Sequence, residues 1–227
     1  MGILENYIMP KRREFFVQLV TLASGVVLFP QFAFSAPAQA EPQGKLNVLV
    51  DVPLTKPADW DPIEFNRLRG NAGAIPLSYL EDINGPDGEK KYLGQHLPYI
   101  PKINPSPAPK GFVALLWGDP SKGYARHPQA PPDPSAKFQG HWFDWIRVRK
   151  ATAGTNQEIE SKYTNWPVPN PSDSGSYAVL GGGNITADEG KNTIYLAALP
   201  KGVVPGDTVR IWAHCRLHGE YVDFIKI

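Results

Sequence analysis

TVRIWAHCRLHGEYVDFIKI, residues Thr208 to Ile227, closes the chain. Residues 208–213 and 220–227 are rich in β-branched and aromatic side chains, and 220–227 nearly alternates, so both predict β-strands. The stretch between them contains Cys215, the only cysteine, and His218. A thiolate and an imidazole three residues apart can reach one metal ion. The segment therefore predicts two strands that carry a candidate metal-binding pair.

The rest of the chain predicts an all-β protein. It contains 24 prolines and 21 glycines, which favour short strands and long loops over long helices. Short helical turns are expected at 62–70 and 77–83. Many short strands with long connections indicate an antiparallel β-sandwich or a partly closed barrel. Further segments with strand character are 46–52, 112–117, 141–148 and 193–198.

Proline-rich stretches predict long loops at 99–110, 128–140 and 166–176, and a turn at 181–184. The loop 128–140 separates two histidines, and long loops inside a compact domain are usually functional or disordered. We interpret this loop as functional. In the strand after it, strict alternation would place Trp142, Asp144, Ile146 and Val148 on one face, opposite His141, Phe143, Trp145 and Arg147.

The N-terminal 40 residues resemble a bacterial twin-arginine export signal. Arg12 and Arg13 precede an apolar stretch, and Ala38-Gln39-Ala40 has the form of a cleavage site. An N-terminal membrane anchor is the alternative. The export hypothesis predicts cleavage of residues 1–40, a mature periplasmic chain of one β-sandwich domain at 41–227, and no stable membrane insertion after cleavage.

The charge balance argues against nucleic acid and anionic membrane surfaces as partners. The chain has 23 basic and 22 acidic residues, of which three basic and two acidic ones lie in the first 40, so the remainder has no net charge. The single cysteine excludes an intrachain disulfide. It is either buried and inert or a metal ligand.

The chain has only five histidines, and most of them stand in distinctive contexts. His96 precedes Leu97-Pro98, His127 precedes Pro128, and His141 opens the aromatic strand at 141–148. We therefore hypothesise a mononuclear metal site made of several histidines and Cys215. His214 should point to the opposite strand face from Cys215, as a surface or supporting residue. Trp142, Trp145 and Trp212 are expected to be core residues, and Asp144 and Asp223 solvated or supporting ones.

These elements resemble the superoxide reductases, the family that includes neelaredoxin and the iron domain of desulfoferrodoxin. His96-Leu97-Pro98 is similar to its His-Val-Pro element. His127-Pro128 and the strand from His141 are similar to its second and third histidines. Cys215-Arg-Leu-His218-Gly219 is similar to its Cys-Asn-Ile/Leu-His-Gly signature. The elements stand in the family's order and cover roughly residues 95 to 227.

The resemblance implies an immunoglobulin-like β-sandwich with one iron. Its equatorial ligands would be His96, His127, His141 and His218, with the Cys215 thiolate axial and one position open for substrate. Imidazole suits iron, and an axial thiolate increases electron density on the metal. The implied reaction reduces superoxide to hydrogen peroxide by one-electron transfer, and an external one-electron donor then re-reduces the iron. The backbone around Cys215 would tune the potential by hydrogen bonds to sulfur.

The chain departs from the family pattern before the first histidine. Many members have Glu-Lys there, and this chain has Gly94-Gln95. Lys90 and Lys91 lie six and five residues upstream of His96 and are the candidate positive charges for an anionic substrate. The gaps between the ligand motifs are also longer than usual, and there is no Cys-x-x-Cys for a rubredoxin-like domain.

Three other functions remain open. A blue-copper-like electron carrier is also an exported β-sandwich with one cysteine and a nearby histidine, but normally has an axial methionine. Met1 and Met9 are the only methionines. A related iron protein acting on another small substrate cannot be separated from a reductase by sequence. A partner-binding sandwich without metal is the third, and association into oligomers is possible.

Overall fold

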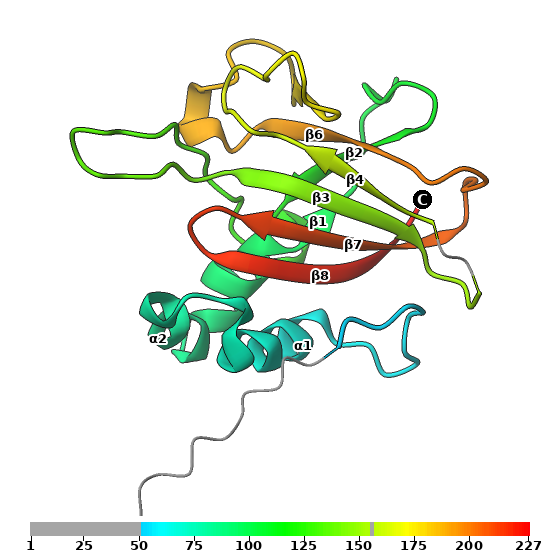
Figure 1. Cartoon of the computed structure of the whole chain (residues 1–227), viewed down its shortest axis with the longest axis horizontal. Coiled ribbons are helices and arrows are strands. Elements are labelled where there is room, and N and C mark those ends of the chain that lie inside the picture. The colour runs from blue at the N-terminus through cyan, green and yellow to red at the C-terminus, as the bar shows by residue number, and fades with distance from the viewer. Residues whose placement is uncertain (1–50, 155–156) are drawn as a thin grey trace, which may run out of the picture. The chain divides into compact units, whose positions relative to one another are not determined.

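Two antiparallel four-stranded sheets form the protein, as the computed structural model of residues 51–154 and 157–227 shows (Figure 1). The first sheet has the order β1 (Pro98–Tyr99), β2 (Phe112–Trp117), β6 (Thr193–Ala198), β5 (Ser176–Val179). The second has the order β4 (Glu158–Lys162), β3 (Phe143–Lys150), β7 (Thr208–Cys215), β8 (Gly219–Lys226). The predicted all-β sandwich is confirmed, and the barrel alternative is wrong for the described residues.

Most predicted strands are present. Strands β2 and β6 have the predicted bounds, and β7 and β8 meet at Cys215 and Gly219. The short strands β1, β4 and β5 were not predicted. Of the strand predicted at 46–52, residues 46–50 lie outside the described residues, and Asp51 and Val52 are not in a strand. The expected export signal at 1–40 also lies outside them.

The alternation predicted for the strand from His141 is wrong, because a β-bulge interrupts β3. Phe143 pairs with Cys215 and Trp145 with His214, so two steps on β3 match one step on β7. Phe143 therefore shares the inner face with Ile146, and Trp145 takes the outer one. Both inner residues are fully buried. The bulge brings Phe143 toward the histidines at the end of the sandwich.

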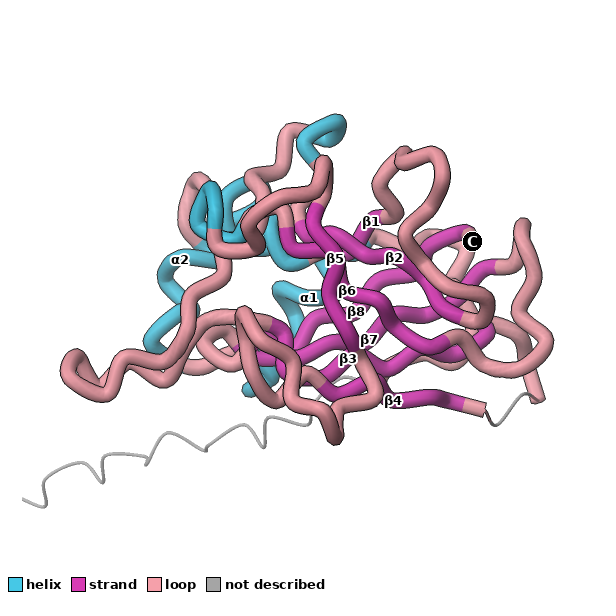
Figure 2. Tube along the Cα trace, turned by 90° about the horizontal axis from the view of Figure 1, so that it is seen from above, coloured by secondary structure: helices cyan, strands magenta, loops and turns pink. Residues whose placement is uncertain are grey.

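A run of short helical segments precedes the strands: α1 (Pro62–Arg69), a π-turn (Gly70–Ala74), a 3-10 turn (Leu77–Tyr79), α2 (Leu80–Asn84), a π-turn (Gly88–Leu93) and a 3-10 turn (Gly94–His96). Later 3-10 turns occupy Pro120–Lys122 and Ala187–Gly190. The two predicted helical regions are confirmed, and the segment that carries His96 was not predicted. Figure 2 shows the helices gathered at one end of the strands. Among the described helices, none is both long and apolar enough to cross a membrane.

The helical layer closes the free edge of the second sheet through Asn66. This residue of α1 is fully buried, and its amide binds the backbone of the edge strand β8 twice. Asn66 Nδ2 donates to the Val222 carbonyl at 2.7 Å, and the Val222 N–H donates to Asn66 Oδ1 at 2.8 Å. A side-chain amide thus replaces a neighbouring strand, which protects an otherwise open edge.

Asn66→Ala should destabilise the protein by roughly 2–4 kcal/mol, because it leaves two buried backbone groups of Val222 without partners. Asn71→Ala is the matched control, since Asn71 is exposed and its side chain bonds only exposed Asn84. Urea unfolding of both variants measures the difference. Equal losses of unfolding free energy in the two variants would show that the contact of Asn66 with β8 adds little to stability.

Aromatic residues join the two sheets next to the end that holds the histidines. Trp117 of β2 stacks on Phe143 of β3, with centroids 3.7 Å apart. The Phe143 N–H donates to the Tyr195 hydroxyl of β6 at 3.1 Å. Both contacts cross from one sheet to the other, so this end of the core is a rigid support for side chains placed on it.

Candidate metal centre

The four predicted histidines and Cys215 converge at one end of the sandwich. One ligand atom from each of His96, His127, His141, Cys215 and His218 lies within 4.8 Å of every other. His96 and Cys215 are fully buried, His127 is 1% exposed, His141 is 8% exposed and His218 is half-buried. The predicted set is therefore brought together, from segments up to 122 residues apart in sequence. This group can hold a metal ion.

The four imidazole rings form a closed circuit. Neighbouring centroids are 4.6 Å apart for His96 and His127, 4.3 Å for His127 and His141, 4.6 Å for His141 and His218, and 5.0 Å for His218 and His96. Across the circuit, His96 and His141 are 6.4 Å apart. Cys215 Sγ lies 3.6 Å from His127 Nε2 and 3.8 Å from His218 Nδ1. The thiol therefore contacts two rings that are not neighbours in this circuit.

The nitrogen separations suit ligands of a common ion better than hydrogen bonds among the rings. His218 Nδ1 lies 3.0 Å from His96 Nε2 and 3.1 Å from His141 Nε2. One ring nitrogen has a single in-plane hydrogen-bonding position, so it cannot satisfy both neighbours. Two nitrogens bound at about 2.0–2.1 Å to one ion at a right angle are about 3.0 Å apart. The donor set thus fits a cation between the rings.

A tight turn sets the spacing of Cys215 and His218. The His218 N–H donates to the Cys215 carbonyl at 3.2 Å, and Gly219 follows with φ of 84°. A side chain at position 219 would also collide with the Ala74 carbonyl, which lies 2.2 Å from an ideal Cβ. Both the positive φ and this close approach require glycine. The signature Cys-x-x-His-Gly is therefore a hairpin that turns both ligands inward.

The loop 128–140 begins and ends beside ligands. Ala130 and His141 exchange two backbone hydrogen bonds of 2.8 Å, which bring the chain after His127 next to His141. Asp133 and Phe138 pair in the same way farther out. The loop is thus a small hairpin whose base joins two ligands, which explains why a long gap between them is tolerated.

The backbone at Tyr92 fixes the orientation of His96. His96 Nδ1 lies 2.6 Å from the Tyr92 carbonyl oxygen. Because a carbonyl only accepts, Nδ1 carries the proton, and the lone pair on Nε2 faces the cluster. A ligand histidine held through its other nitrogen is the usual arrangement at metal sites.

A buried chain of polar groups supports His127. Gln129 Nε2 lies 3.1 Å from His127 Nδ1, and the Tyr195 hydroxyl donates to Gln129 Oε1 at 2.8 Å. Tyr195 accepts the Phe143 N–H at the same time. Gln129 is 4% exposed and Tyr195 is fully buried. His127 is therefore held by contacts that reach across to the other sheet.

Burial keeps the four imidazoles neutral. Loss of hydration lowers the pKa of His141 to about 4 and that of His218 to about 3. The same cause, together with neighbouring histidines, holds the pKa of His96 and His127 well below the usual value. Neutral imidazole is the form that binds metals.

The Cys215 thiol is protonated unless a cation is present. Burial raises its pKa to about 12, and hydrogen bonds from the Leu217 and His218 backbone N–H groups oppose that shift. These two N–H groups stabilise negative charge on sulfur, as the sequence resemblance implied. A bound cation would supply the remaining stabilisation for a thiolate.

Aromatic rings seal most of the cluster. Tyr221 stacks on His96 with centroids 4.2 Å apart, and Tyr79 stacks on His218 at 3.9 Å. Tyr79, Tyr221 and His141 are buried, whereas His218 is half-buried. Among the five donors, solvent therefore reaches the cluster from the side of His218. No sequence pattern distinguishes these tyrosines from ordinary core residues, because aromatic residues on strands and helices usually pack in the core.

The two predicted lysines lie outside the cluster. Lys91 pairs with Asp87 at 2.7 Å, and both side chains are exposed. Lys90 is exposed on the same turn. Among the described residues, neither ammonium donates a hydrogen bond to the five clustered side chains. Their role toward a substrate stays a prediction.

Other side chains near the cluster differ in part from expectation. His214 points to the outer face as predicted, and its Nδ1 lies 2.6 Å from Asp144 Oδ1. Asp223 is 5% exposed and accepts the Trp60 indole N–H, so the expectation of a solvated carboxylate is wrong for it. Trp142 is in the core, whereas Trp145 and Trp212 are half-buried on the outer face. The bulge in β3 explains the position of Trp145.

Comparison with family models, curated proteins and solved structures found no match. The fold and the site together define an all-β sandwich protein with a buried His/Cys cluster that can hold a metal ion.

Proposed function

We propose that the protein is a mononuclear non-haem iron protein with one-electron chemistry, of the superoxide reductase type. The observation that carries the proposal is the closed circuit of four neutral imidazoles with a thiol against two of them. Iron bound there would supply one electron at a time to a small ligand, and superoxide with one electron and two protons becomes hydrogen peroxide. Imidazole and thiolate donors suit this metal.

The chain's own residues support that chemistry in three ways. Four of the five donors are buried and His218 alone is half-buried, so the side of His218 remains for a small ligand. Backbone N–H groups of Leu217 and His218 stabilise the thiolate. Contacts from Tyr92 and Gln129 orient two of the rings. A preorganised, largely dry donor set limits reorganisation during electron transfer.

A blue-copper carrier fits these residues less well. Such sites use two histidines and a cysteine in a trigonal arrangement with a weak axial ligand. Here four histidines meet Cys215, and the chain's two methionines, Met1 and Met9, lie outside the described residues.

A second candidate is a related iron protein that acts on another small ligand. Gly94 stands where the resemblance has glutamate, and an ideal Cβ there would lie 2.3 Å from the Tyr124 ring. Gln95 stands where it has lysine, and its amide donates to the Arg126 carbonyl at 3.2 Å. Neither position offers a charge to an anionic substrate, and this is the observation in favour of the second candidate.

Metal analysis and a visible spectrum of the oxidised protein test the iron site, and pulse radiolysis of the reduced protein tests the substrate.

If superoxide is the substrate, Lys90→Ala/Lys91→Ala should slow the second-order reaction about two- to fivefold at low salt, through loss of attraction for the anion. Lys102→Ala/Lys110→Ala removes two exposed charges elsewhere and should leave the rate unchanged. A wild-type rate equal to that of free ferrous iron would reject superoxide and leave the second candidate.

A further inference from the structure

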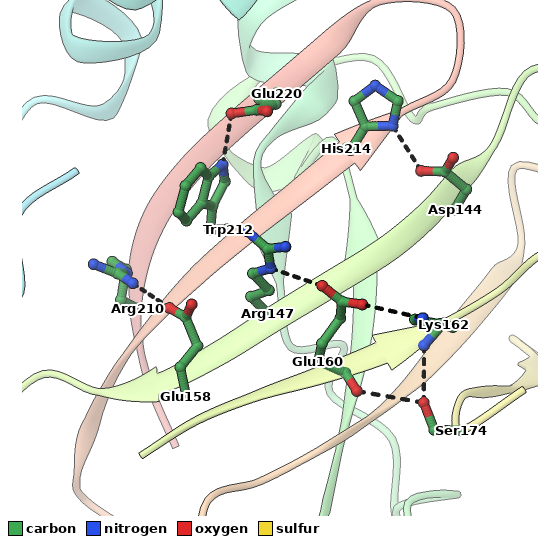
Figure 3. A network of polar contacts seen from close by, with 10 residues as sticks. All are labelled: Asp144, Arg147, Glu158, Glu160, Lys162, Ser174, Arg210, Trp212, His214 and Glu220. Atoms are coloured by element: carbon green, nitrogen blue, oxygen red, sulfur yellow. Dashed lines mark hydrogen bonds and ion pairs between the residues drawn. The ribbon is translucent and has the colours of Figure 1, made fainter. Parts of the chain in front are cut away.

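The histidines of this protein are held through their Nδ1 atoms in two opposite ways. His96 Nδ1 lies 2.6 Å from the Tyr92 carbonyl oxygen. His214 Nδ1 lies 2.6 Å from a carboxylate oxygen of Asp144, on the outer face of the second sheet (Figure 3). Carbonyl and carboxylate oxygens only accept hydrogen bonds, so both rings carry their proton on Nδ1. His127 is held in the other way.

The side-chain amide of Gln129 donates to His127. Gln129 Nε2 lies 3.1 Å from His127 Nδ1 and 3.4 Å from the His127 carbonyl oxygen, and the Tyr195 hydroxyl donates to Gln129 Oε1 at 2.8 Å. Both neighbours require this orientation of the amide, because its nitrogen must face acceptors and its oxygen a donor. His127 Nδ1 therefore accepts, and the ring proton is on Nε2. That atom faces the cluster, 3.6 Å from Cys215 Sγ.

Neighbouring segments confine the side chain of Gln129. Its backbone N–H donates to the Glu189 carbonyl at 2.7 Å, and an ideal Cβ on Gly190 would lie only 2.7 Å from Gln129 Cβ. Gln129 is 4% exposed and Tyr195 is fully buried. The amide therefore stays between His127 and Tyr195. A half-turn about its last bond exchanges nitrogen and oxygen without moving the rest of the side chain.

We propose that Gln129 and Tyr195 are positioning residues that control metal binding by His127 through the direction of their hydrogen bonds. A neutral imidazole that binds a metal through Nε2 carries its proton on Nδ1, so the Gln129 amide must turn and offer its oxygen. One proton changes place on the ring, from Nε2 to Nδ1, and no electron moves. The inference rests on the metal site of the proposed function and not on its substrate.

Tyr195 opposes this turn. After it, the amide nitrogen donates to the Tyr195 oxygen, which already accepts the Phe143 N–H at 3.1 Å. The oxygen has two lone pairs and can accept both, but the hydroxyl proton then has no acceptor. Among the described residues, only Gln129 accepts that proton. A buried donor without a partner costs free energy, so Tyr195 favours the orientation in which His127 does not bind metal.

Nitrogen NMR of the histidine rings, with and without zinc(II), tests the turn directly. Zinc(II) is diamagnetic and takes histidine and cysteine donors. His127 should carry its proton on Nε2 before zinc is added and on Nδ1 afterwards. His96 and His214 should carry theirs on Nδ1 in both states, which makes them internal controls. Any other placement of the His127 proton in either state would overturn the inference.

The affinity for zinc(II) separates this role from simple support of the ring. Tyr195→Phe should tighten binding about fivefold, because no hydroxyl proton is left unpaired when the amide turns, whereas loss of a supporting residue weakens binding. Gln129→Glu should tighten it about tenfold, since a carboxylate accepts from both His127 and Tyr195 without a turn. Gln139→Glu is the matched control on an exposed part of the same loop and should leave the affinity unchanged.

Equal or weaker zinc binding in Tyr195→Phe, or equal affinities for Gln129→Glu and Gln139→Glu, would overturn the inference. Failure of the proposed function looks different. Zinc(II) would still bind and move the proton of His127, but the purified protein would contain no iron and would show no one-electron chemistry. A wild-type protein that takes up no zinc would overturn both.

Discussion

If the cluster holds iron as proposed, Cys215→Ser is expected to abolish the visible colour of the oxidised protein and its fast one-electron chemistry, while the fold persists. The thiol is the only sulfur in the cluster and the only donor there that becomes negatively charged. Two backbone N–H groups already point at it. Serine keeps the size of the side chain but does not form a comparable anion at neutral pH. A sulfur-to-metal absorption band would be lost, and the reduction potential would rise because less electron density reaches the metal.

Ala213→Ser is the matched control for that variant. Ala213 is also fully buried on the inner face of β7, two residues before Cys215, so the control introduces the same hydroxyl into the same strand. It should cost about 1–3 kcal/mol of stability for an unpaired buried hydroxyl, and it should keep the colour. Visible spectroscopy, metal content and urea unfolding separate the two variants. A Cys215→Ser protein that keeps the band would show that sulfur is not a ligand.

The sequence was sufficient for the cluster because metal donors are rare in this chain. With one cysteine and five histidines, the motifs that resemble those of the superoxide reductases selected Cys215, His218 and three upstream histidines, and all five converge. Several strands of the sandwich could also be predicted, because the sequences of β2, β6 and the hairpin of β7 and β8 are apolar or alternating. Local chemistry sufficed wherever the pattern was strong.

The parts that could not be predicted depend on contacts between distant segments. Gln129 looks like an ordinary loop residue, yet it joins His127 to Tyr195 of the other sheet. Tyr79 covers His218 only because the helical layer folds over the end of the sandwich. The bulge at Phe143 and Trp145 has no glycine to mark it, so strict alternation misassigned the faces of β3. The hydrophobic periodicity of a sequence does not tell which side chains from distant segments contact each other.

The cluster also predicts how stability depends on pH once the metal is removed. Folded-state pKa values near 4 for His141 and near 3 for His218 lie below the unfolded value of 6.5, so the unfolded chain binds more protons below about pH 6.5. Stability should therefore fall as pH decreases from about 6.5 toward 4. A pKa shift as large as that of His141 corresponds to a loss of about 3 kcal/mol in the free energy of unfolding once the imidazole is fully protonated. The Cys215 thiol, with a pKa near 12 against 9.0, has the opposite sign and should reduce stability as pH rises above 9.

Removal of the metal by a chelator should lower the melting temperature by about 10 °C at pH 7. Metal present at a thousand times its dissociation constant stabilises the folded state by about 4 kcal/mol, and each kcal/mol is worth about 2–4 °C in a chain of this length. Melting curves of the loaded and chelated protein from pH 4 to 10 measure both effects, and added metal should restore the loaded curve.

His127→Ala should melt at the same temperature with or without chelator, whereas His214→Ala should respond as wild type does, because the His214 ring lies outside the cluster. A wild-type protein that carries metal and loses it without any change in melting would show that the five donors do not bind it as a unit.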